Sequence, residues 1–103
     1  MKRITSRDNA AIKHLHALAT SARERRKAGE TLLDGAHLVQ TALSRGQALR
    51  QIVVSDAGLA QAEIVALLAA APDVETLVLP EALFAHVSPV DSPSGVLAVM
   101  PLP

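Results

Sequence analysis

The sequence predicts an α/β protein: a three-layer α/β/α sandwich in which helices cover both faces of a small sheet of about four strands. Short apolar runs typical of strands alternate with longer segments whose apolar positions recur at helical spacing. Half of the residues are hydrophobic but Phe84 is the only aromatic residue, so we expect a core of Leu, Val, Ile and Ala. A chain of 103 residues provides one core, and we expect residues 1–103 to form a single domain.

The first half of the chain predicts a helix, a basic segment, a strand and a second helix. Asn9 is a suitable helix cap, and apolar residues follow it at helical spacing as far as Ala19. Ser21–Lys27 is polar and strongly basic, which predicts a helical extension or a loop that stops at Gly29. We therefore treat residues 1–30 as a basic helical N-terminal segment. The expected strand, turn and helix then lie at Thr31–Leu33, Asp34-Gly35 and Leu38–Leu43.

The second half repeats the strand and helix alternation. β-Branched and aliphatic residues predict three strands, at residues 49–54, 74–79 and 95–100. The helical stripe between the first two of these strands ends at Pro72, and a short helix is expected at residues 80–87. The predicted order is helix then strand, four times.

The charge is divided unevenly along the chain. The net charge is zero, yet residues 1–27 carry eight basic residues against Asp8 and Glu24, which gives +6. The remaining residues carry two basic against eight acidic residues, which gives −6. A local positive field of this kind attracts a polyanion, so a nucleic acid is a candidate partner.

Two motifs could bind phosphate. Arg23, Arg25, Arg26 and Lys27 place four cations within five residues, with a solvated helix end as the alternative interpretation. Gly35-Ala36-His37 follows a strand and begins a helix, so its free backbone N–H groups could receive a phosphate; an ordinary strand-to-helix turn is the alternative.

No pattern indicates that this chain carries out catalysis by itself. Cysteine is absent, no Gly-x-Ser-x-Gly, P-loop or dinucleotide-binding pattern occurs, and we predict no catalytic residue and no cofactor in this chain. His14 and His16 are two residues apart and point to different sides of a helix, so we expect no metal site. No apolar stretch is long enough to span a membrane and no leader segment is evident, so we expect a cytoplasmic protein with no membrane partner.

Several short motifs are distributed over essentially the whole chain. They are Arg3–Asn9, Arg23–Lys27, Gly29, Leu32–Gly35, Leu38-Val39, Ala42-Leu43, Gly46, Ile52–Val54, Val87-Ser88 and Pro93–Val99. Their order and spacing resemble the opening of the SpoU (TrmH) family of RNA 2′-O-ribose methyltransferases.

The resemblance implies the role of an N-terminal substrate-binding domain, with a fold similar to that of kink-turn-binding ribosomal proteins. In those proteins the equivalent helix opens with Gly-x-Asn-Glu, and Gly35-Ala36-His37-Leu38 lies in the matching place. His37 and Leu38 depart from that pattern, which leaves backbone contacts at Gly35 and Ala36. We expect Arg23, Arg25, Arg26 and Lys27 to hold RNA phosphates and Arg3 and Arg7 to extend the surface.

The resemblance also implies a longer enzyme. Past Pro103 we expect a knotted SPOUT domain, absent from this chain, that binds S-adenosylmethionine, carries out the methyl transfer and forms a homodimer. The expected partner is structured RNA, either ribosomal or transfer RNA. Two alternatives stay open: a free-standing kink-turn-binding protein, and a protein-interaction or dimerisation module.

Overall fold

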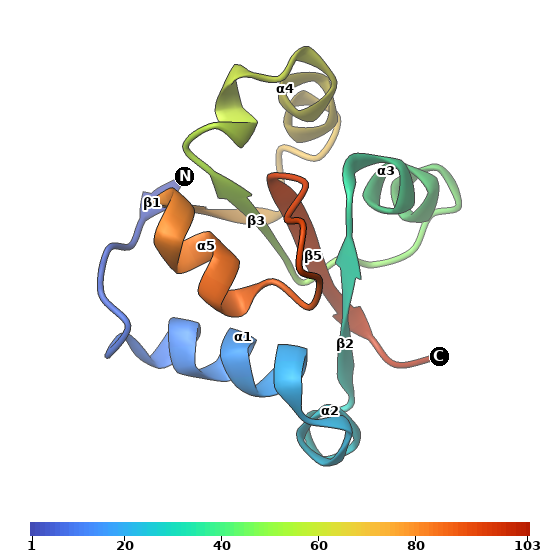
Figure 1. Cartoon of the computed structure of the whole chain (residues 1–103). Helices are drawn as coiled ribbons and strands as arrows, with labels where there is room; N and C mark the ends of the chain where they lie inside the picture. Colours follow the sequence, from blue (N-terminus) through green and yellow to red (C-terminus); the bar gives the residue numbers. More distant parts are fainter.

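The computed structural model describes residues 1–103, which form alternating strands and helices (Figure 1). The strands are β1 (Lys2–Arg3), β2 (Glu30–Asp34), β3 (Gln51–Ser55), β4 (Glu75–Leu79) and β5 (Val96–Pro101). The helices are α1 (Ala10–Thr20), α2 (Ala22–Ala28), α3 (Ala36–Ser44), α4 (Ala62–Ala69) and α5 (Glu81–Val87), with a 3₁₀ turn, η1 (Gly58–Ala60), before α4. None of the helices is long and apolar enough to cross a bilayer.

The strands form one mixed sheet in the order β1-β4-β3-β5-β2. β1, β4 and β3 pair in parallel, whereas β5 runs antiparallel to both of its neighbours. The four expected strands are present, and β1 is a fifth. It pairs Lys2 with Leu77 and Arg3 with Val78, and the Ile4 N–H donates to the Val78 carbonyl at 3.0 Å. Two exposed residues carry no strand pattern, so β1 was not predicted.

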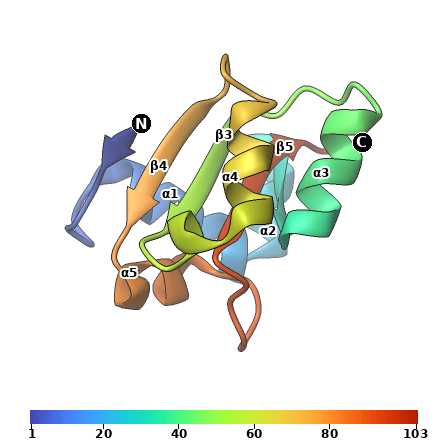
Figure 2. The same cartoon turned by 90° about the horizontal axis from the view of Figure 1, so that it is seen from above.

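Helices cover both faces of the sheet, which confirms the predicted three-layer architecture (Figures 1 and 2). α1 and α5 pack on one face, where Leu15, Phe84 and Val53 lie in one buried cluster. α3 and α4 pack on the other, where the neighbours of Val53 in the same strand, Ile52 and Val54, are buried with Val39 and Ile64. The alternation along β3 divides the core between two helical layers.

The basic segment after α1 forms a separate short helix, α2. Ser21 is extended (φ −136°, ψ 114°) and therefore ends α1, while its N–H still donates to the Ala17 carbonyl at 3.0 Å. The Ser21 hydroxyl then accepts the Glu24 N–H at 3.1 Å and caps α2. Gly29 ends α2 in the left-handed region (φ 68°), where a side chain would be strained. The chain thus changes direction between α1 and α2 instead of extending α1.

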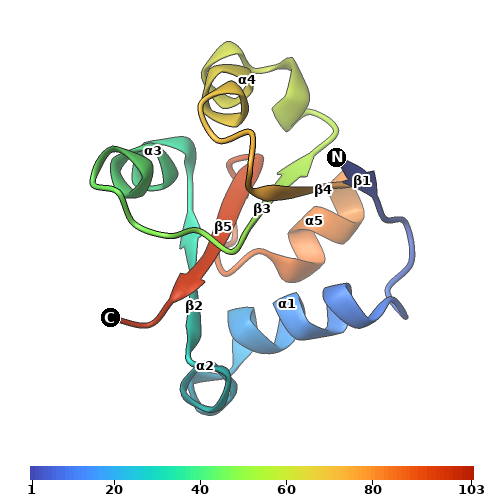
Figure 3. The same cartoon turned by 180° about the vertical axis from the view of Figure 1, so that it is seen from behind.

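α2 and the C-terminal end of β5 lie next to each other at the start of β2. α2 precedes β2 directly, and β5 ends beside it, where the Leu102 N–H donates to the Gly29 carbonyl at 2.9 Å. Figures 1 and 3 show α2 and the C-terminus close to this end of β2, while the N-terminus lies on the far side of the sheet.

Candidate nucleic-acid interface

α2 presents an exposed group of cations. No residue of this seven-residue helix is buried, and Arg23, Arg26 and Lys27 are exposed. The ion pairs of the structure are Arg3–Asp56, His14–Glu30 and Arg50–Glu30, so no carboxylate pairs with a cation of α2. The charges of Arg23, Arg26 and Lys27, which we call the α2 cations, are therefore available to an external anion.

Arg25 differs from the other basic residues of α2. Its Nη1 donates to the Leu18 carbonyl at 2.7 Å, and the side chain is only partly exposed. Leu18 lies in the last turn of α1, where carbonyl oxygens have no partner within the helix. Arg25 therefore joins α1 to α2, and this bond holds the α2 cations in place.

Arg3 and Arg7 lie apart from the α2 cations. Arg3 is in β1, at the edge of the sheet opposite to β2, and four strand spacings separate the two edges, roughly 19 Å. Its Nη1 contacts Asp56 Oδ1 at 2.7 Å, and both side chains are about half exposed. Arg7 is exposed in the loop before α1, near His86 of α5. Burial lowers the pKa of His86 below its ordinary value, and the charges of Arg7 and His16 lower it further.

Gly35, Ala36 and His37 begin α3 at the other end of β2 from α2. Gly35 has φ 104°, a conformation that other residues rarely adopt, and α3 has no side-chain cap. The neighbouring Asp34 is half-buried, and its Oδ1 has no hydrogen-bond partner. Burial raises the pKa of Asp34, although a hydrogen bond from Ser88 acts in the opposite direction. Leu32 and Leu33 lie in the clusters on opposite faces, so the alternation along β2 places Asp34 on the face of α1 and α5, away from α3. The phosphate contact at Gly35, Ala36 and His37 stays a prediction.

The sequence did not reveal the role of Glu30, which lies next to Gly29. Glu30 is buried (8% exposed), and its Oε2 accepts from Arg50 Nη1 at 2.7 Å. Its Oε1 lies 2.7 Å from His14 Nε2. Burial alone would raise the pKa of Glu30, but the hydrogen bonds and charges of Arg50 and His14 outweigh it, and the pKa is lowered. His14 and Arg50 are 16 and 20 residues away in sequence, so no local pattern could have brought the three together.

The histidines lie in separate environments. His14 points to Glu30, whereas His16 stacks on His86 with ring centroids 4.1 Å apart, and its Nδ1 lies 3.0 Å from the His86 carbonyl. The prediction that His14 and His16 point to different sides of α1 is confirmed.

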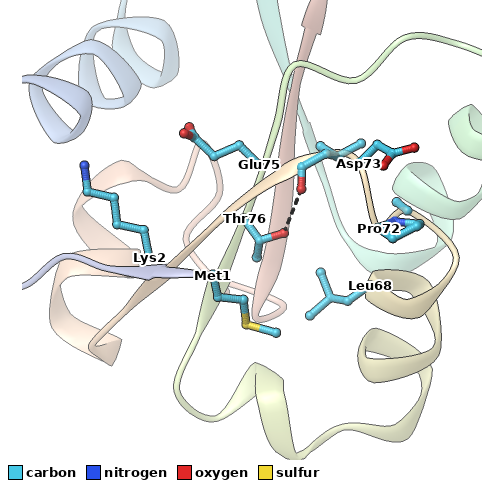
Figure 4. A pocket seen from close by; sticks show the side chains of 9 residues that line it. Met1, Lys2, Leu68, Pro72, Asp73, Glu75 and Thr76 are labelled. Atoms are coloured by element: carbon cyan, nitrogen blue, oxygen red, sulfur yellow. Dashed lines mark hydrogen bonds between the residues drawn. The ribbon is translucent and has the colours of Figure 1, made fainter.

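The largest hollow of the molecule, about 580 Å³, lies at the β1 edge (Figure 4). Carboxylates of Asp73 and Glu75 and the apolar side chains of Met1 and Leu68 line it, together with Lys2. In Figure 4 the Lys2 amine points away from the Asp73 side, and Thr76 donates to the Val74 carbonyl. Two carboxylates and one lysine give this pocket a net negative charge, which does not suit an anionic ligand. The pocket therefore does not extend the surface formed by the α2 cations.

Comparison with known proteins identifies the family. Residues 9–98 match the model of the MRM3-like substrate binding domain. The chain belongs to this family. The match extends from the cap of α1 into β5, so this substrate-binding domain includes α2 and the Glu30 contacts. No curated protein matches the sequence.

Solved structures confirm the resemblance to the SpoU (TrmH) family. The domain is similar to an RNA 2′-O ribose methyltransferase, with 31% identity and a TM-score of 0.80, over 98% of this chain and 38% of that chain. It has the fold of part of an rRNA methyltransferase from Sinorhizobium meliloti (22% identity, TM-score 0.76, 99% of this chain and 37% of that chain). It also has the fold of part of the SpoU methyltransferase AviRb from Streptomyces viridochromogenes in complex with AdoMet (23% identity, TM-score 0.76, 92% of this chain and 34% of that chain). The chain thus spans less than two fifths of the length of these structures.

Proposed function

We propose that this substrate-binding domain holds RNA for a SpoU-type 2′-O-ribose methyltransferase and that the α2 cations make its main phosphate contacts. The family match supports substrate binding, and the RNA methyltransferases among the structural neighbours support RNA as the substrate. The domain itself binds and orients the RNA, and no residue of it is assigned a catalytic role.

The exposed and unpaired state of the α2 cations carries this proposal. A helix that buries no side chain contributes little to the core, and cations without carboxylate partners add nothing to the ion pairs of the fold. Arg25 and the Ser21 cap nevertheless hold this helix in a defined position. A fixed group of free cations is what a phosphate backbone requires of a protein surface.

The whole protein is proposed to contain a catalytic SPOUT domain after Pro103. This domain would bind S-adenosylmethionine and form the homodimer, as the family resemblance implies, and the AdoMet complex of AviRb is in keeping with it. The bond from Leu102 to Gly29 places the end of β5 beside α2. RNA bound to α2 would therefore lie next to the segment that leads into the catalytic domain. The proposed RNA is structured ribosomal or transfer RNA, in the cytoplasm.

The test is a titration of the domain with ribosomal RNA and, separately, transfer RNA at several salt concentrations. Reversing the three α2 cations together (R23E, R26E and K27E) should reduce the slope of log affinity against log salt by roughly two to three. Arg25 stays in place because it holds α1. The matched control is Arg45→Glu, which reverses an exposed arginine at the end of α3 on the other face of the sheet.

Unchanged affinity and slope in the triple variant would overturn the role of α2. An isolated kink-turn RNA is titrated in parallel: tighter binding to it than to either natural RNA would favour the free-standing kink-turn binder. Self-association without RNA binding, measured by sedimentation, would instead favour the protein-interaction module.

A further inference from the structure

Arg50 has the features of a cation positioned by the fold and still open to solvent. It lies directly before β3, where its backbone N–H donates to the Val99 carbonyl at 2.8 Å. Its Nη1 donates to Glu30 at 2.7 Å, yet 51% of the side chain is exposed. The guanidinium has five N–H donors, and the structure shows no side-chain hydrogen bond of Arg50 other than the one to Glu30. The other donors make no side-chain hydrogen bond within the protein, and half of the side chain is open to solvent.

Glu30 is the residue that fixes this orientation. A buried carboxylate needs partners, and Glu30 has two, Arg50 and His14, from elements on either side of it. Because its carboxylate is engaged on both oxygens and only 11% of its side chain is exposed, Glu30 presents little negative charge to an incoming phosphate. The exposed faces of this cluster are those of His14 and Arg50.

The cluster adjoins the α2 cations. Glu30 follows Gly29, the residue that ends α2, and is three residues from Lys27. Arg50 therefore reaches from the start of β3, past β5, to the residue that follows the cap of α2. A surface built this way contains cations from two segments more than twenty residues apart in the sequence, which suits the two-dimensional spread of phosphates on folded RNA.

We infer that Arg50 is a further RNA-phosphate contact that continues the α2 surface across the end of the sheet. The buried Glu30 holds Arg50 in place, and His14 is the second partner of Glu30. This inference rests on the proposed function, because it extends the same surface. It adds a residue of the second half of the chain to a surface for which the sequence predicted only positions between 3 and 37.

The test compares Arg50 with an exposed cation at the opposite edge of the sheet. Arg50→Gln should reduce the slope of log affinity for transfer RNA against log salt by about one, with a loss of affinity of roughly tenfold at low salt. Lys2→Gln is the control, because Lys2 is exposed in β1 and lies outside the predicted RNA surface. It should leave the slope unchanged. Far-ultraviolet circular dichroism at the titration temperature checks that both variants are folded.

Arg50→Lys and Glu30→Gln separate a direct contact from a structural role. If Arg50 touches phosphate, Arg50→Lys keeps the charge and should restore the salt slope that Arg50→Gln loses. Glu30→Gln leaves Arg50 charged but less firmly held, so it should weaken binding with little change of the slope. If Arg50 only braces β2 against β3, Arg50→Gln weakens binding without changing the slope, and the inference is overturned. An effect of Arg50→Gln no larger than that of Lys2→Gln also overturns it.

The same experiment distinguishes this inference from the proposed function. Loss of binding in the α2 triple variant with no effect at Arg50 refutes the inference alone. An effect at Arg50 with an unaffected triple variant refutes the role of α2 and supports the Arg50 contact. Absence of RNA binding by the unaltered domain refutes both.

Discussion

The two edges of the sheet each hold an arginine 2.7 Å from a carboxylate, yet the two ion pairs differ in environment. At the β1 edge, Arg3 meets Asp56, whose side chain is 46% exposed. At the β2 edge, Arg50 meets Glu30, whose side chain is 11% exposed and also contacts His14. Water screens the first pair, so that pair contributes little to stability. The second pair contains a buried carboxylate, which joins β2 to α1 and to the start of β3.

The difference supports the β2 edge as the place of the proposed RNA contact. At the β1 edge the acids Asp56, Asp73 and Glu75 remain at the surface and offset Lys2 and Arg3. At the β2 edge Glu30 is buried and held by Arg50 and His14, and α2 has one acid, Glu24, against four basic residues. α2 therefore keeps a net positive charge, whereas the three acids at the β1 edge outnumber Lys2 and Arg3.

The largest effect on stability is expected from loss of the buried carboxylate. Glu30→Gln should lower the free energy of unfolding by about 2 kcal/mol at pH 7, because two charge-assisted hydrogen bonds are weakened. The folded pKa of Glu30 lies below its ordinary value of 4.5, so this stabilisation is present above pH 4.5 and is lost as the pH falls through the folded pKa. Urea unfolding at pH 7 and pH 3.5 measures it. A difference between the two proteins that does not shrink at pH 3.5 would contradict the buried-pair interpretation.

A smaller effect is expected at the cap that orients α2. Ser21→Ala removes the acceptor of the Glu24 N–H and should cost about 1 kcal/mol in thermal or urea unfolding. Since the cap also sets the direction of α2, RNA affinity should fall as well. Ser21→Asp retains an acceptor and serves as the control; equal losses in both variants would show that the cap is not the cause.

The smallest effect is expected at the β1 edge. Arg3→Gln removes an exposed ion pair and should change the free energy of unfolding by at most about 0.5 kcal/mol. Asp56→Asn should behave alike. A loss as large as that of Glu30→Gln would remove the distinction between the two edges, and a fall in RNA affinity would support the predicted contact of Arg3 with RNA.

Much of the fold followed from local patterns. Asn9, Gly29 and the run before Pro72 marked helix ends close to those observed, and the aliphatic runs marked four of the five strands. These signals depend on residues within one or two turns of each other. The break at Ser21 was left open, because a polar basic stretch fits both a longer helix and a loop; the Ser21 cap and the Arg25 bond to Leu18 decide it.

The sequence by itself determined the three-layer class, the concentration of positive charge in residues 1–27 and the resemblance to the SpoU family. The tertiary structure alone decided which of these charges lie together. It separated Arg3 from α2 by the width of the sheet, assigned Arg25 to Leu18, and brought His14 and Arg50 to Glu30. The physical reason is that periodicity and capping act between near neighbours, whereas the field at a surface depends on partners that only strand order brings together.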